Sequence, residues 1–275
     1  MREIADVRSA TRIEASDAAI IVAHPDDETI GCGATLARLD GAGLVVVTDG
    51  APRAGADAAR AGFASSSDYR AARAAELRSA LAVAGVAPHR LVEFGLSDQS
   101  VCSALAPLTH RLASFFESRG VAVAFTHAFE GGHPDHDGIA FCARAAVALL
   151  GPRAPALIEM PYYHLGDDGA SMVAQRFCDG DDGIIVDLPD RLRLTKQAMT
   201  RAHASQEAVL RGFRCDSERY RLAKTYDFRS LPNAGRIFYA TFDSGFAPQD
   251  WAATARAALC ELRLDGALRR WFSFA

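Results

Sequence analysis

Two short segments carry side chains that could bind a metal ion. Residues 23–28 read AHPDDE, and residues 132–137 read GHPDHD. Each segment follows an apolar run typical of a buried strand, at residues 18–23 and 121–126. In an open α/β sheet, ligands bind beyond the carboxyl ends of the strands. We therefore expect the two segments to meet at that edge of the sheet, although they lie far apart in the sequence.

The residue types match a catalytic zinc site, which uses three nitrogen or oxygen ligands and keeps one position open. His24 and Asp27 are three residues apart on a tight loop that enters a predicted helix, so both can point at one ion. His136 can complete the set. Zinc lowers the pKa of bound water to about 7, which makes hydroxide available at neutral pH. A site of two histidines and one aspartate also accepts iron or cobalt, so the metal's identity stays open.

Other residues of the two segments could transfer protons. Asp26 cannot easily share the ligand position of its neighbour, so its carboxylate is suited to act as a general base. His133 could stabilise an oxyanion or protonate a leaving amine, and Asp135 could orient the imidazole of His133. His164 follows a further predicted strand and could contact the substrate or the leaving group. Either segment alone could be an ordinary polar turn, but the pair favours an active site.

The pattern along the chain predicts an α/β fold. Strands and helices alternate over the first part of the sequence as in repeated βαβ units, which indicates a mostly parallel sheet with helices on both faces. Further strands are expected at residues 44–48, 91–94, 156–160, 184–188 and 236–242. Helices are expected at residues 29–42, 68–84, 104–119, 139–150, 189–210 and 251–262. Long loops are expected at residues 51–67 and 165–183. We expect one domain, with a core at residues 18–161 and a less regular extension at residues 162–275.

Charge and hydropathy exclude several classes of partner. The 275 residues carry a formal net charge of −4, which gives no basic field for nucleic acid or anionic lipid. No stretch approaches the roughly 20 apolar residues that a membrane span needs. Residues 1–17 are polar and lack the apolar core of a signal peptide. We expect a cytoplasmic protein that acts on a small molecule, and the sequence leaves its oligomeric state open.

These motifs resemble the PIG-L/LmbE family of zinc-dependent de-N-acetylases, which act on N-acetylglucosamine-type sugars in conjugates. The resemblance rests on AHPDDE after the first strand, GCGATLARL in the next helix, TDG after the second strand and EGGHPDHD after a later strand. The motifs occur in the family's order within residues 18–150. The resemblance implies a Rossmann-like sheet whose carboxyl-edge loops bind the sugar.

The resemblance also implies roles for individual residues. It assigns metal binding to His24, Asp27 and His136, and catalysis to Asp26, His133 and Asp135. Asp26 is the general base in this pattern, and His133 stabilises the tetrahedral intermediate with Asp135 behind it. Arg73 matches an Arg-x-x-Glu helix start whose arginine faces the substrate hydroxyl groups. Asp98 matches a position that hydrogen-bonds the sugar.

Three functions fit this sequence. The leading one is metal-dependent removal of an N-acetyl group from an amino sugar in a conjugate. The second keeps the metal but cleaves an N-acyl amide on a non-sugar metabolite, or one with a longer acyl chain. The third is a non-catalytic sugar-binding protein, against which Asp26 argues because binding alone has little use for a spare carboxylate beside a metal. Residues 51–67 and 162–183 are expected to select the aglycone and the acyl group.

Overall fold

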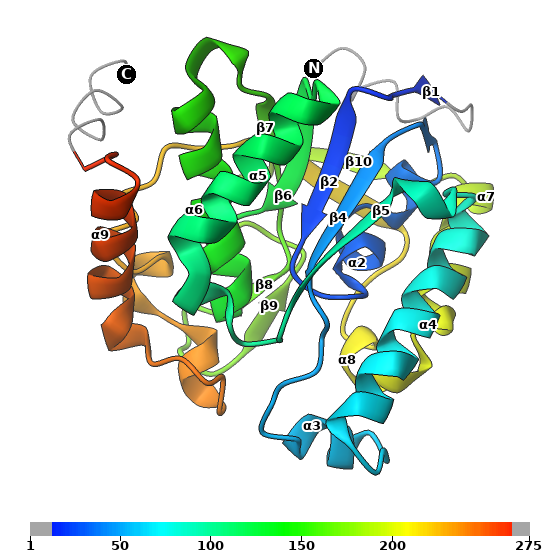
Figure 1. Ribbon diagram of the computed structural model, residues 1–275. Helices are drawn as coiled ribbons and strands as arrows, with labels where there is room; N and C mark the ends of the chain where they lie inside the picture. Colours follow the sequence, from blue (N-terminus) through cyan, green and yellow to red (C-terminus); the bar gives the residue numbers. More distant parts are fainter. Residues whose placement is uncertain (1–12, 266–275) are drawn as a thin grey trace.

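Seven strands form the central sheet, in the order β10-β11-β7-β6-β2-β4-β5 (Figure 1). The fold is that of a computed structural model, which describes residues 13–265. Most of the polar N-terminal segment therefore lies outside the described residues. The strands of this sheet are β2 (Ala18–Val22), β4 (Gly43–Thr48), β5 (Leu91–Leu96), β6 (Val123–His127), β7 (Ala156–Met160), β10 (Ile184–Asp187) and β11 (Ser217–Leu222). Two small sheets pair β1 (Ile13–Glu14) with β3 (Leu39–Asp40), and β8 (Tyr163–Leu165) with β9 (Met172–Ala174).

The direction of the strands confirms the predicted fold class. β5, β4, β2, β6 and β7 are all parallel, whereas β11 is antiparallel to both β7 and β10. The chain builds outward from β2 to β4 and β5, and then returns to the other side of β2 to build β6 and β7. The order of strands thus reverses between β2 and β6. This is the point at which open α/β sheets bind their ligands.

Helices cover both faces of the sheet (Figure 1). Alternate residues of β2 point to opposite faces, so Ile21 packs into the apolar core beneath α5, α6 and α9, and Ile20 packs into the core beneath α2, α4 and α7. The helices are α2 (Asp27–Leu36), α3 (Ala56–Arg60), α4 (Ser66–Ala84), α5 (Leu105–Arg119), α6 (Pro134–Leu150), α7 (Asp190–Ala202), α8 (Glu207–Leu210) and α9 (Trp251–Glu261). None of the helices among the described residues is long and apolar enough to span a membrane.

Several local predictions differ from the structure. The expected helix at residues 189–210 ends at Ala202, because the backbone of His203 leaves the helical region with ψ 60°. The expected loop at residues 51–67 contains α3, and the loop at residues 165–183 contains β9. The strand expected at residues 236–242 is wrong, since a 3₁₀ turn occupies part of that segment.

A buried ion pair joins α7, α2 and β11. Lys196 Nζ lies 2.9 Å from Glu218 Oε1 and donates a hydrogen bond of 2.9 Å to the carbonyl of Ile30. Both charged side chains are inaccessible to solvent, with exposures of 1% and 0%. The pair fixes α2, the helix that begins at Asp27, against the sheet.

Replacing Lys196 with Met should lower the free energy of unfolding by about 3–5 kcal/mol, because the Glu218 carboxylate would stay buried without its cation. Urea denaturation followed by circular dichroism measures this change. The matched control is Arg211→Met, which breaks the exposed pair between Arg211 and Glu207 and should have little effect. Equal stability of the two variants would contradict this role of Lys196.

Candidate metal centre

The loops after β2 and β6 bring the two histidine-containing segments together, as the sequence predicts. His24 lies in the short loop between β2 and α2, and His136 lies in the first turn of α6. Asp26 sits at the start of α2 with φ 139°, a backbone conformation that is strained for any residue except glycine. Hydrogen bonds from Thr29 N and Ile30 N to the Asp26 carbonyl hold this conformation.

Three ligand atoms from these loops form a nearly equilateral triangle. Asp27 Oδ2 lies 3.2 Å from His24 Nδ1 and 3.3 Å from His136 Nε2. The two imidazole nitrogens are themselves 3.3 Å apart. A tetrahedral ion with bonds of 2.0–2.1 Å requires ligand separations of about 3.3–3.4 Å. All three residues are buried, and their donor set and spacing fit a metal ion.

The other nitrogen of the His24 ring faces carboxylates. His24 Nε2 lies 3.0 Å from Asp98 Oδ1 and 3.3 Å from Asp135 Oδ2. Histidines that bind metals commonly donate their second N–H to a carboxylate, which fixes the tautomer and the ring orientation. Asp135 also accepts backbone hydrogen bonds from Gln99 and Val101, so its position is fixed. The Asp135 carboxylate thus contacts His24, while its backbone N–H donates to Nδ1 of His133, the imidazole that Asp135 is predicted to orient.

The pKa values of the two adjacent aspartates are shifted in opposite directions. Burial alone would raise the pKa of Asp27, but the His136 and His24 imidazoles hold it well below its usual value. Burial raises the pKa of Asp26 to about 7, although the Arg73 guanidinium acts in the opposite direction. Asp26 is thus a carboxylate that lies next to the triangle without belonging to it.

Arg73 supports the strained loop. Its guanidinium donates to the carbonyls of Pro25, at 2.7 Å, and Gly50, at 2.9 Å, and it lies 3.2 Å from Asp26 Oδ2. The sequence predicts that Arg73 binds substrate hydroxyl groups. The structure places it at the cavity wall with both terminal nitrogens already engaged, so its clearest action is to hold Asp26 in place.

His133 faces the cavity in a defined tautomer. Its Nδ1 accepts the backbone N–H of Asp135 at 3.2 Å and so caps α6. Burial lowers the pKa of His133 well below its usual value, which keeps the ring neutral. With Nδ1 accepting, the proton of the neutral ring is on Nε2. His133 therefore offers one N–H donor beside His24, whose ring centroid is 4.6 Å away.

Two fully buried aromatic rings back the centre. His127, the last residue of β6, stacks on His136 with ring centroids 4.1 Å apart, and its Nε2 accepts the backbone N–H of Ala23. Tyr162 packs against His127 and donates its hydroxyl to the carbonyl of Asp27 at 3.0 Å. These contacts fix the positions of the loops that carry His24, Asp27 and His136.

Further hydrogen bonds fix the backbone at Asp26. Its backbone N–H donates to Glu28 Oε2, while Glu28 Oε1 lies 3.1 Å from His203 Nε2. The next residues also contact α4, because Ser205 donates to the Glu76 carboxylate through both its backbone N–H and its hydroxyl. The segment after α7 therefore supports the backbone around Asp26 and the packing of α4.

The centre opens into a cavity of about 440 Å³. The predicted site residues on its wall are His24, Asp26, Asp27, Arg73, Asp98, His133 and His136. Aromatic side chains form another part of the wall, namely Tyr69, Tyr163, Phe213 and Phe242. Phe242 lies parallel to the ring of His133, with centroids 6.2 Å apart.

The structure corrects the prediction for His164. Side chains alternate along a strand, and Tyr163 of β8 lines the cavity whereas His164 does not. Sequence reasoning missed Phe213 and Phe242. No signal near either residue marks it, because each lies far along the chain from both histidine motifs and is brought to the cavity by the C-terminal loops.

Comparisons with known proteins find one family-model match and several similar folds. Residues 19–147 match the family model described as PIG-L, GlcNAc-PI de-N-acetylase. No curated protein sequence matches the chain. Among solved structures, the A40926 pseudoaglycone deacetylase Dbv21 is 24% identical with a TM-score of 0.54, over 74% of this chain and 86% of that one. The N,N'-diacetylchitobiose deacetylase from Pyrococcus horikoshii is 20% identical with a TM-score of 0.54, over 74% and 82%.

The same fold also occurs in a protein with different chemistry. The 4-carboxy-2-hydroxymuconate hydratase GalB from Pseudomonas putida KT2440 is 15% identical with a TM-score of 0.50, over 80% of this chain and all of that one. The fold alone therefore does not determine the reaction, which depends on the residues of the site. His24, Asp26, Asp27, His133 and His136 all lie within residues 19–147, the segment that matches the PIG-L family model.

Proposed function

We propose that this protein is a metal-dependent hydrolase that removes an N-acetyl group from an N-acetylglucosamine-type sugar in a conjugate. The observation that carries the proposal is the triangle of His24, Asp27 and His136, with Asp26 beside it at the wall of a cavity. His24, Asp27 and His136 would hold the metal, for which zinc suits the donor set and iron or cobalt are alternatives. When bound, the metal supplies Lewis-acid polarisation and makes water more acidic.

The chain's own residues account for the proton movements. Asp26 takes a proton from the attacking water as the new C–O bond forms. The Nε2–H of His133 donates a hydrogen bond to the acyl oxygen as that oxygen gains negative charge. The C–N bond then breaks as Asp26 returns the proton taken from the water to the leaving nitrogen, and acetic acid, which ionises to acetate, is the second product. Arg73 holds the Asp26 carboxylate near the cavity throughout.

The cavity wall supports a small-molecule substrate. Its volume of about 440 Å³ is within the range of small-molecule pockets, and its wall combines aromatic rings with a few polar groups. Aromatic side chains can pack against the face of a sugar ring. The same rings, Tyr163, Phe213 and Phe242, also favour a second candidate function, cleavage of an amide with a longer or non-sugar apolar group.

A substrate panel separates the two functions. Zinc-loaded protein would be incubated with N-acetylglucosamine conjugates of different aglycones, with the matched N-octanoyl conjugates and with N-acetyl amino acids. We expect acetate release from the sugar conjugates, measured by an enzyme-coupled acetate assay. Hydrolysis confined to the N-octanoyl compounds or to the amino acids would contradict the sugar de-N-acetylase and support the second function.

A further inference from the structure

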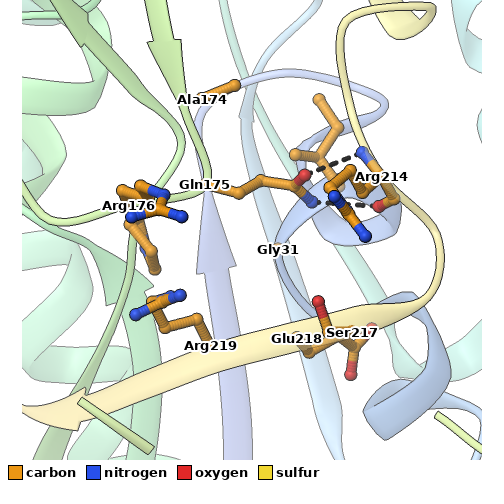
Figure 2. A pocket seen from close by; sticks show the side chains of 10 residues that line it. Gly31, Ala174, Gln175, Arg176, Arg214, Ser217, Glu218 and Arg219 are labelled. Carbon is orange, nitrogen blue, oxygen red and sulfur yellow. Dashed lines mark hydrogen bonds between the residues drawn. The ribbon is translucent and has the colours of Figure 1, made fainter. Parts of the chain in front are cut away.

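A second cavity of about 140 Å³ lies beside the first turns of α2, where Ile30 and Gly31 line it (Figure 2). It is set between α2, the loop that follows β9 and the start of β11. Three arginines contribute to its wall, Arg176, Arg214 and Arg219. Figure 2 shows Arg176 and Arg219 reaching in from the β9 and β11 sides, with Arg214 across from them. Ile30 lines both this cavity and the one at the metal centre.

Two of these arginines have guanidinium N–H groups that form no hydrogen bond with residues 13–265. The Arg176 guanidinium has no hydrogen-bond or ion-pair partner among residues 13–265. Arg219 engages Asp182 through Nη1 alone, and the Asp182 side chain is 78% exposed. An ion pair to so exposed a carboxylate is weak, and the Nε and Nη2 donors of Arg219 remain available.

The one carboxylate on the wall does not oppose an anion. Glu218 Oε1 accepts from Ala34 N and from Lys196 Nζ. Its Oε2 accepts from Thr35 N, Thr35 Oγ1 and the hydroxyl of Tyr220. Both oxygens are therefore saturated, and the charge of Glu218 is balanced by the buried Lys196. Arg214 is paired with Asp216 and Arg219 with Asp182, so within the described part of the chain Arg176 supplies the uncompensated positive charge at the cavity.

The rim of the cavity is held in an unusual conformation. Gln175 has φ 54°, in the left-handed region that non-glycine residues seldom adopt. Its side-chain amide forms two hydrogen bonds with the backbone of Arg214, at 2.7 and 3.1 Å (Figure 2). This clamp fixes the loop after β9 against the loop before β11, so Arg176 and Arg214 are presented from a defined frame.

We propose that this cavity binds a small oxyanion of the phosphate class, free or as the phosphoryl group of a metabolite. Guanidinium groups match the oxygen geometry of phosphate and bind it through paired N–H donors. A volume of about 140 Å³ corresponds to roughly four or five waters at about 30 Å³ each, which is enough for one phosphate group. Because α2 forms the wall between the cavities, the bound anion would adjoin the helix that carries Asp27.

Isothermal titration calorimetry with inorganic phosphate, at constant ionic strength set by chloride, tests this site. Arg176→Gln should weaken phosphate binding by about tenfold, the cost of losing one charge-assisted hydrogen bond, and the double variant with Arg219→Gln should weaken it further. Arg176 has no partner to lose, so the single variant should melt at the same temperature as the parent without phosphate. Arg256→Gln, on α9 and outside the cavity, is the matched control and should bind phosphate like the parent.

A metal centre can also bind phosphate, so the titration is repeated on His136→Ala. Binding that persists in His136→Ala and weakens in Arg176→Gln supports the proposal. Binding that is lost in His136→Ala, or that is equal in Arg176→Gln and Arg256→Gln, overturns it. Glucose 6-phosphate as a second titrant distinguishes a phosphoryl metabolite from free phosphate, since only an open cavity accepts both. Acetate binding as tightly as phosphate would also contradict a phosphate-class site.

Discussion

Replacing Asp26 with Asn is expected to reduce kcat by about 10²–10⁴-fold while the metal stays bound. The amide has nearly the shape of the carboxylate and can still accept a hydrogen bond from Arg73, but it cannot take a proton from water. Asp26 lies outside the triangle of ligand atoms, so metal affinity should change little. Steady-state acetate release and metal content by atomic emission measure the two effects separately.

Asp57→Asn is the matched control for that change. Asp57 is another aspartate on the wall of the same cavity, but it pairs with Arg60 near solvent. Its replacement should leave kcat within a few-fold of the parent. If Asp26→Asn retained parental kcat, Asp26 would not be the base, and if it lost metal along with activity, Asp26 would belong among the ligands.

Replacing His136 with Ala should remove both metal and activity. The loss of affinity should exceed the roughly 10–100-fold typical of removing a residue that only supports a ligand. Dialysis against a zinc buffer followed by metal analysis gives the affinity, and circular dichroism confirms that the variant is folded.

His164→Gln is the control for the loss of a buried histidine. His164 is 7% exposed but does not line the cavity, so its variant should keep a full metal complement and parental kcat/KM. A full metal complement in His136→Ala would remove His136 from the ligand set. Loss of metal in both variants would show that the measurement reports general damage to the fold.

The parallel core of the fold was predictable because its strands are short apolar runs that stand apart from their surroundings. β7 occupies the predicted residues, and β2 lies within its predicted run. β11 was not recognised, since three of the six residues in its sequence SERYRL are charged and no apolar run marks a strand. That pattern is stabilised by tertiary contacts, such as the ion pair of Glu218 with Lys196, which no local signal shows.

The metal centre was predictable for a different reason. Its candidate ligands lie in two compact motifs, and the parallel sheet brings the ends of β2 and β6 to one edge. The contacts of Asp98 and Asp135 with His24 were not predictable, because they depend on side-chain directions after three separate elements. His164 was misplaced for a similar reason, since a shift of one residue along a strand reverses the side-chain direction.

The most direct test of the central claim is acetate release as a function of metal content. The protein would be stripped with a chelator, assayed on an N-acetylglucosamine conjugate, and then titrated with zinc. We predict that the stripped protein is inactive and that activity rises to a plateau at one zinc per chain. Full acetate release by the stripped parent, or none at any zinc content with every conjugate, would contradict the account.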